Sequence, residues 1–243
     1  MRVLIVADVH GNLEALESVV ADAEERGGFD QVWSLGDVVG YGPNPGECID
    51  LLGRFDTRAI AGNHDLAAIG KMSPQDFNDD ALAAIVWTTT KLSDAHKSYL
   101  EGLPLTQRLD GFTLAHGSPR DPTSEYLKSV EAVVENLPYF NTARLLVGHT
   151  HVSFVCRTVA ERATFFKFPV DEPVALGNDR LVINPGAVGQ PRDMDPTASY
   201  AIYDLDEGAI THHRVKYDIL KTQQKMTEQE LHKYLIERIG FGI

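Results

Sequence analysis

The stretch that decides the fold is VLIVADVHGN, residues 3–12. It begins with five apolar residues, and Asp8 and His10 follow this run in the sequence. An uninterrupted apolar run of this length is typical of a β-strand that is covered on both faces, as in α/β proteins. Ligands in such folds bind beyond the carboxyl ends of the strands, so Asp8 and His10 are candidate site residues.

The same pattern returns along the chain. Each copy is a short apolar run of strand length that ends in small or polar residues. The further copies are QVWSLGD (31–37), TRAIAGNHD (57–65), FTLAHGS (112–118), RLLVGHTH (144–151) and RLVINPG (180–186). Helical patterns lie between several of these runs, and the alternation of strand, loop and helix predicts a layered α/β fold.

The first helix is predicted from an apolar stripe that begins at Leu13 and ends near Gly27, with Asn12 as a candidate N-cap. Further helices are expected within 43–53, 79–102 and 129–137. Alternating residues around DEGA predict a hairpin within 200–218. Thr227 and Glu230 have capping-box spacing, which predicts a helix over 227–239.

These elements predict a single domain over residues 1–243, with a core over 1–204 and a C-terminal hairpin and helix over 205–243. This C-terminal segment can pack on the domain or on a second subunit, so a homo-oligomer stays open. The 243 residues are 43% hydrophobic, enough to bury a core.

Composition limits the partners. The formal net charge is −13 and no run of Lys and Arg offsets it, so a long nucleic acid is a poor partner. Small phosphorylated ligands fit if a bound cation supplies positive charge. Cys48 and Cys156 indicate no disulfide framework and favour a reducing compartment. The N-terminal apolar run is too short for a signal peptide or a membrane span, so we expect a cytoplasmic protein without membrane contact.

Metal-ligand residue types gather at the ends of the predicted strands. Five of the nine histidines lie there, and a structural role is expected for His96, His212, His213 and His232. Residues two apart on an extended chain project to the same side, so we expect Asp8 to converge with His10, and His149 with His151. The full set at the predicted rim is Asp8, His10, Asp37, Asn63, His64, Asp65, His116, His149 and His151.

A single histidine at a strand end would be structural. Five histidines together with carboxylates and an amide at the ends of the predicted strands predict a metal site. Carboxylate, imidazole and amide ligands without thiolate favour manganese, with iron, zinc or nickel as alternatives. Seven or more ligands exceed the needs of one ion, so two divalent ions are expected. One shared carboxylate would bridge ions roughly 3.5–4 Å apart.

The motifs DVH, GDVVG, GNHD, HG and GHTH, in that order over residues 8–151, resemble the five-block signature of the calcineurin-like metallophosphoesterases. GYGPNP (40–45), HGSPRD (116–121) and NPGAVGQPRD (184–193) resemble its small bacterial phosphodiesterase-like branch. The resemblance implies a four-layer α/β sandwich, in which two mixed β-sheets are flanked by helices.

The resemblance also implies a role for each matching residue. Asp8, His10 and His151 would hold the first metal ion, and Asn63, His116 and His149 the second. Asp37 would bridge both ions, and Asn63 would also face the substrate. His64 would lie outside the metal shell and face the phosphate, and Asp65 would orient it.

The implied chemistry is hydrolysis of a small phosphodiester or phosphomonoester. A hydroxide that bridges both ions would attack phosphorus in line. His64 would protonate the leaving group as general acid, a step worth roughly 10²–10⁴-fold. We expect the acidic neighbour Asp65 to favour the protonated form of His64.

One block departs from the related protein phosphatases, whose GDxxDRG block carries a phosphate-gripping Arg. Here Gly40–Tyr41 stands in place of Asp-Arg, which disfavours a large phosphoprotein substrate. Arg192 is either a substitute phosphate contact or part of a surface ion pair. Asn12 either contacts substrate or only caps its helix, and Tyr41 and Tyr126 either line the pocket or pack.

Three alternatives to a simple phosphoesterase stay open. A phosphoprotein phosphatase and a dinucleoside polyphosphate hydrolase would use the same chemistry. A non-catalytic scaffold would resemble the retromer-type subunit that has lost its catalytic histidine. The scaffold is disfavoured here because His64 and every expected ligand are present.

Overall fold

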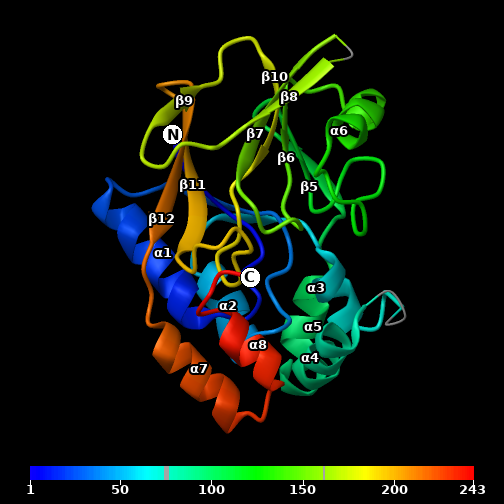
Figure 1. The fold of residues 1–243 in the computed structure, drawn as a ribbon, viewed down its shortest axis with the longest axis vertical. Coiled ribbons are helices and arrows are strands. Elements are labelled where there is room, and N and C mark those ends of the chain that lie inside the picture. Colours follow the sequence, from blue (N-terminus) through cyan, green and yellow to red (C-terminus); the bar gives the residue numbers. More distant parts are fainter. Residues whose placement is uncertain (74–76, 161) are drawn as a thin grey trace.

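Two mixed six-stranded sheets lie face to face in the computed structural model, which describes residues 1–73, 77–160 and 162–243 (Figure 1). The first sheet has the order β3 (Thr57–Ala59), β2 (Gln31–Ser34), β1 (Arg2–Val6), β11 (Ala198–Asp204), β12 (Ala209–Val215) and β9 (Pro173–Ala175). The second has the order β4 (Thr106–Leu109), β5 (Phe112–Ala115), β6 (Arg144–Leu146), β10 (Arg180–Asn184), β7 (Phe154–Val159) and β8 (Arg162–Phe166). Each of the six predicted apolar runs contains a strand.

The alternation of side chains along β1 explains why its run is apolar throughout. Val3 and Ile5 enter the core between the two sheets, together with Trp33 of β2 and Phe112 of β5. Leu4 and Val6 point the other way, into the core under the helices. Both faces of β1 are therefore buried, and the strand has no face on which a polar residue would be solvated.

Helices cover both outer faces and complete the four predicted layers. They are α1 (Leu13–Glu25), α2 (Pro45–Leu52), α3 (Asn63–Ala68), α4 (Asp79–Lys91), α5 (Asp94–Glu101), α6 (Val130–Asn136), α7 (Ile219–Glu228) and α8 (Lys233–Arg238), with a 3₁₀ turn, η2, at Leu137–Tyr139. The helices α1 and α2 pack on the first sheet, and α6 packs on the second. The predicted α/β sandwich of two mixed sheets is confirmed.

The C-terminal region differs from the prediction in one element. The predicted hairpin is present as β11 and β12, which pair antiparallel from Ala198 with Val215 to Asp204 with Ala209. The single helix predicted over 227–239 is wrong, because Thr227 lies in the last turn of α7 and Glu230 has a left-handed φ of 56°. That turn redirects the chain, and α8 begins only at Lys233.

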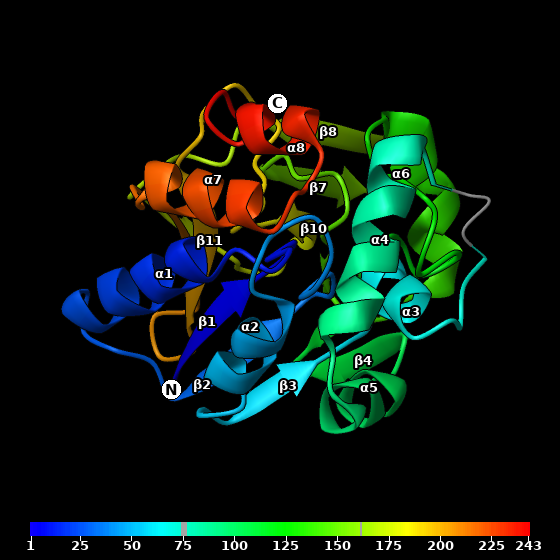
Figure 2. The same ribbon diagram turned by 90° about the horizontal axis from the view of Figure 1, so that it is seen from below.

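The C-terminal segment packs on its own chain. Strand β11 pairs with β1 inside the first sheet, and α7 lies beside α1 (Figure 2). We therefore propose that residues 1–243 form one domain, in which the hairpin belongs to the core sheet.

Several smaller expectations concern residues away from the strand ends. Cys48 and Cys156 are both free and buried. None of the described helices is long and apolar enough to cross a membrane. The four remaining histidines each have a structural partner: His96 with Asp50, His212 with Ser199, His213 with Asp171 and His232 with Asp80.

Candidate metal centre

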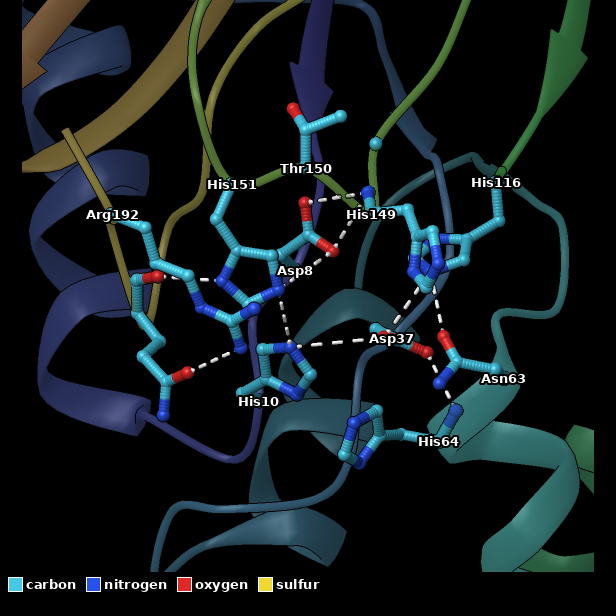
Figure 3. Close-up of polar contacts among 12 residues, drawn as sticks. Asp8, His10, Asp37, Asn63, His64, His116, His149, Thr150, His151 and Arg192 are labelled. Atoms are coloured by element: carbon cyan, nitrogen blue, oxygen red, sulfur yellow. Dashed lines mark hydrogen bonds and ion pairs between the residues drawn. The ribbon is translucent and has the colours of Figure 1, made fainter. Parts of the chain in front are cut away.

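The candidate ligands come from the carboxyl ends of strands in both sheets and meet at one edge of the sandwich (Figure 3). The loops after β1, β2 and β3 in the first sheet carry Asp8, His10, Asp37 and Asn63. The loops after β5 and β6 in the second sheet carry His116, His149 and His151. The expectation that one sheet rim supplies them all is corrected, because the site lies where the two sheets meet.

The backbone at this edge is left-handed at five of these residues. The φ angles are 53° at Asp8, 49° at His10, 53° at Asp37, 64° at His149 and 59° at His151. Such conformations cost about 1–3 kcal/mol each in non-glycine residues, and they cluster at functional sites. Asp8 and His10 still converge as expected, but the convergence expected for His149 and His151 is wrong, because these two residues fall into separate groups of candidate ligands.

The first group is Asp8, His10 and His151, whose ligand atoms lie close enough to hold a metal ion. His151 Nε2 lies 3.5 Å from Asp8 Oδ1 and 3.2 Å from His10 Nε2. Asp8 also accepts the backbone N–H of His149 at 3.1 Å from each carboxylate oxygen, which ties the loop after β6 to β1.

The second group is Asp37, His116 and His149. His116 Nε2 lies 3.2 Å from Asp37 Oδ2 and 3.1 Å from Asn63 Oδ1. Asp37 Oδ2 also lies 3.7 Å from His10 Nε2, so this oxygen stands between the two groups. The other oxygen, Oδ1, accepts the backbone N–H of His64 at 2.8 Å.

Three imidazole rings are anchored in the same way, each by Nδ1 on a backbone carbonyl. An Nδ1 that donates its proton leaves Nε2 as the lone-pair atom, which is how proteins orient metal-binding histidines. The lone pairs of His10 and His151 then face each other across 3.2 Å, which a cation between them would stabilise. The three anchors are His10 on Val39 (3.1 Å), His116 on Leu35 (2.8 Å) and His151 on Gln190 (2.6 Å).

Two further ligand atoms are buried without a hydrogen bond among the described residues. They are Nε2 of His149 and Oδ2 of Asp37. Buried polar atoms are nearly always paired, so unpaired atoms on nitrogen and carboxylate donors that face one point indicate a missing ion. The residues therefore fit a metal centre of nitrogen and oxygen ligands.

Burial dominates the electrostatics of the site. It raises the pKa of Asp8 to about 7 and lowers the pKa of His149 to about 3. Burial also acts to lower the pKa of His116, but the carboxylates of Asp37 and Asp8 outweigh it and raise that pKa to about 9. The carboxylates thus draw a proton onto His116, and a bound cation would displace it.

The GNHD block, residues 62–65, is organised differently from the prediction. Asp65 does not touch the ring of His64; its carboxylate accepts the backbone N–H groups of Asp37 (2.8 Å), Gly62 (3.0 Å) and Val39 (3.1 Å). The expected orienting role is therefore corrected, and Asp65 holds the loop that carries Asp37. Gly62 has an extended φ of −96° and is needed for space, because a Cβ there would lie 2.1 Å from Asp37 Oδ1.

His64 is also less basic than expected. Burial lowers the pKa of its ring to about 4, although the charge of Asp37 acts to raise it. The Nδ1 atom has no hydrogen-bond partner among the described residues, and a Cβ on Gly40 would lie 2.6 Å from it. The ring packs edge-on against His10 and lies 4.5 Å from the ring of Tyr41, measured between ring centres. It can also form a third group of potential metal ligands with His10 and Asp37.

A cavity of about 300 Å³ opens beside the metal centre. Arg192 lines it, and its guanidinium lies beside His151 in Figure 3, with its carbon 5.9 Å from the centre of the Tyr41 ring. Among the described residues no carboxylate lies within ion-pair range of Arg192, so the alternative of a surface ion pair does not hold. The lining includes Tyr41, Asn63, His64, Tyr126, His149 and Arg192.

Tyr41 and Tyr126 both line the cavity and pack on the ligand histidines. The ring of Tyr126 stacks on His149 with 3.9 Å between ring centres. Asn12, by contrast, caps α1, since its Oδ1 accepts the backbone N–H of Ala15 at 3.2 Å. Its Nδ2 donates to the carbonyl of Gly189, so these bonds support the capping alternative, and a substrate contact of Asn12 stays a prediction.

Several residues that line the cavity were not predicted from the sequence, and two of them come from α8. Tyr234 and Arg238 of α8 line the cavity, although they lie far from every recognised motif. Their approach depends on how α8 docks on the domain, and no local pattern signals that. The backbone carbonyls that anchor the histidine rings were also not predicted, because every residue has a carbonyl and the sequence does not show which ones face a side chain.

Comparisons with known proteins identify the family of the chain. A family model described as a calcineurin-like phosphoesterase superfamily domain matches residues 1–208. An uncharacterized protein of Methanocaldococcus jannaschii is 36% identical over 250 residues, covering 99% of this chain and 98% of that protein. A symmetrical bis(5'-nucleosyl)-tetraphosphatase of Psychromonas ingrahamii is 34% identical over 90 residues, or 35% of this chain and 33% of that enzyme.

The crystal structure of a metallophosphoesterase from Sphaerobacter thermophilus superposes with a TM-score of 0.91 at 43% identity, covering 100% of this chain and 99% of that one. The family match spans most of the 243 residues and includes every candidate ligand. The chain therefore belongs to the calcineurin-like phosphoesterase superfamily and is a phosphoric ester hydrolase.

Proposed function

We propose that the protein hydrolyses a small phosphodiester or phosphomonoester with the help of two divalent metal ions. The observation that carries this proposal is the 3.2 Å approach of two buried Nε2 atoms, on His10 and His151, whose Nδ1 atoms are fixed on carbonyls. The proposed ligands of one ion are Asp8, His10 and His151, those of the other are Asn63, His116 and His149, and Asp37 is shared.

The ligand types favour manganese, with iron, zinc or nickel as alternatives, because they are imidazole, carboxylate and amide donors. When bound, two such ions neutralise phosphoryl oxygens and lower the pKa of a water molecule toward neutrality. Asp37 suits the shared position because its Oδ2 lies 3.2 Å from His116 Nε2 and 3.7 Å from His10 Nε2, near histidines of both groups.

His64 is the proposed general acid for the leaving group. It differs from His10, His116 and His151, whose rings are anchored on carbonyls, because Nδ1 of His64 is unpaired. It also lines the cavity, where a leaving group would lie. Burial lowers the pKa of its ring to about 4, and the negative charge of a bound phosphoester would act to raise it.

Arg192 is the proposed phosphate contact in place of the arginine that the GDVVGYG block lacks. Its backbone N–H donates to the carbonyl of His151 at 3.2 Å, and its Nη2 donates to Gln190 Oε1 at 2.7 Å. These bonds hold an arginine without a carboxylate partner against the metal centre. A guanidinium fork in this position suits phosphoryl oxygens.

The cavity favours a small substrate. Its volume of about 300 Å³ is at the lower end of the range for small-molecule sites. A dinucleoside polyphosphate is a second candidate substrate, supported by the relative named a symmetrical bis(5'-nucleosyl)-tetraphosphatase. A phosphoprotein substrate and a scaffold role are less well supported, and a cytoplasmic location stays a prediction.

The test is a comparison of hydrolysis rates for a simple diester and a simple monoester with Mn²⁺, Zn²⁺, Ni²⁺ or Mg²⁺. We expect turnover with at least one transition metal and a faster diester reaction. Failure of every metal to support hydrolysis of either ester would contradict the proposal and favour the scaffold. Faster turnover of a phosphoprotein than of both esters would contradict the small-substrate assignment.

A further inference from the structure

The C-terminal arm, residues 219–243 with α7 and α8, lies beyond the part of the chain that the family model matches. Polar contacts fix it on α1. Glu14 is buried, and its carboxylate lies 2.5 Å from Lys225 Nζ and 3.2 Å from Lys221 Nζ. Thr222 Oγ1 donates to Oδ1 of Asn12 at 3.2 Å, at the start of α1. The arm is therefore bonded to the start of α1, which follows the loop that carries Asp8 and His10.

Apolar contacts fix the same arm to the wall of the cavity. Met226, Leu231, Leu235 and Ile239 form one buried cluster with Tyr41, Ala81 and Ala84. Gln223 Nε2 donates to the carbonyl of Ile236 at 2.8 Å and joins α7 to α8. Figure 1 shows α8 and α4 at the same lower end of the molecule. One face of α8 is thus positioned against the cavity.

Arg238 of α8 is a charged residue that lines this cavity, as Arg192 does. Its Nε donates to the carbonyl of Ile243 at 2.5 Å, and its guanidinium carbon lies 5.1 Å from the centre of the Tyr234 ring. No carboxylate side chain of the described residues lies within 4 Å of either arginine. Some partly buried arginines pair with a carboxylate, as Arg26 does with Asp22 and Arg214 with Asp193. Arg144 and Arg180 instead donate to backbone carbonyls, away from this cavity.

Arg192 and Arg238 line the same cavity without an aspartate or glutamate partner among the described residues, in a protein of net charge −13. Burial and the nearby charge of Arg192 lower the pKa of Arg238, so the two cations destabilise each other in the free protein. An anion bound between them removes that repulsion. Arg192 lies against His151 of the metal centre, whereas Arg238 is carried by a separate helix, so the two can meet different parts of one ligand.

We propose that Arg238 binds a second phosphoryl group of the substrate, next to the one that is hydrolysed. This deepens the proposed function and rests on it. The substrate class is then a molecule with at least two neighbouring phosphates, such as a nucleoside polyphosphate or dinucleoside polyphosphate. Arg238 is a specificity residue, because the metal ligands, His64 and Arg192 suffice for the scissile group, and a guanidinium recognises a further phosphate by two parallel hydrogen bonds.

The experiment compares AMP with ADP, which differ by one phosphate. Each is tested as a competitor of bis(p-nitrophenyl) phosphate hydrolysis in excess Mn²⁺, and each is titrated into the same protein by calorimetry. The parent protein is expected to bind ADP at least tenfold more tightly than AMP. Arg238→Gln should weaken ADP binding roughly 10–100-fold and AMP binding much less, as expected for the loss of charge-assisted hydrogen bonds.

Two variants make the result specific. Arg238→Lys keeps the charge but loses the fork, and is expected to fall between the parent and Arg238→Gln. Lys233→Gln changes an exposed cation on the same helix and should leave both affinities and the ester turnover unchanged. The proposal is overturned if the parent shows no preference for ADP, or if Arg238→Gln keeps the parent's ratio of ADP to AMP affinity.

The two assays separate the two proposals. If the parent hydrolyses no ester, the proposed function fails, and calorimetry still measures the contribution of Arg238 to binding. If the parent hydrolyses the ester but binds AMP and ADP equally, only the second phosphate site fails.

Discussion

Replacement of Asp65 separates the role predicted from the sequence from the one that the structure supports. In the structure its carboxylate is buried and accepts three backbone N–H groups, from Asp37, Val39 and Gly62. Asp65→Ala removes all three acceptors. At about 1–3 kcal/mol for each buried donor left unpaired, the loss is about 3–9 kcal/mol. That is comparable with the whole free energy of unfolding of a typical domain, about 5–15 kcal/mol.

Asp65→Asn is the milder and more informative change. An amide oxygen in the position of Oδ2 keeps the bonds from Asp37 and Gly62, and only the N–H of Val39 loses its acceptor. The expected loss is about 1–3 kcal/mol. The measurement is urea unfolding of the metal-free protein. The control is Asp94→Asn, an exposed aspartate in the first turn of α5, which should stay within about 0.5 kcal/mol of the parent.

Metal binding provides a second measurement on the same variants. Because Asp65 holds the loop of Asp37, Asp65→Asn should also weaken Mn²⁺ binding. If Asp65→Asn unfolds like the parent and binds metal normally but turns over substrate slowly, the reasoning is refuted and Asp65 acts through His64 instead.

Three further outcomes follow from the proposed centre. His64→Ala should keep its metal ions and lose roughly 10²–10⁴-fold in turnover of an alkyl ester, but much less with p-nitrophenolate, a leaving group that needs no proton; equal losses on both would remove the general-acid role. Asp37→Asn should weaken binding of both ions, so two ions at full occupancy by metal analysis would contradict the shared position. Mn²⁺ at a hundredfold excess over its Kd should stabilise the parent by about 2.7 kcal/mol for each bound ion, or about 5–10 °C in Tm per ion, and an unchanged Tm would contradict metal binding at this site.

Much of the fold was predictable because its signals are local. The runs that became β1, β2, β5, β6 and β10 are buried on both faces, and burial on both faces leaves a continuous apolar run. The helix after β1 carried its own cap in Asn12. The break between α7 and α8 was not predicted, because Thr227 and Glu230 have the spacing of a capping box without forming one. The ends of these helices depend instead on the tertiary packing of Leu231 and Leu235.

The candidate site was predictable in its residues but less so in its geometry. Polar residues at strand ends identified Asp8, His10 and Asp37 without any knowledge of the two-sheet arrangement. The left-handed backbone at His149 and His151 could not be foreseen, because only the tertiary contacts of the site stabilise it. The contacts of Asp65 were missed for a similar reason, since its partners are backbone N–H groups.

The central claim is that two divalent ions, held by ligands from both sheets, are needed for phosphoester hydrolysis. The most direct test titrates metal-free protein with Mn²⁺ and records, at each step, the bound metal per chain and the rate of bis(p-nitrophenyl) phosphate hydrolysis. The rate is predicted to reach its plateau at two bound ions per chain, and to be lost in a chelator. A full rate at one ion per chain, or hydrolysis that persists in the chelator, would contradict the account.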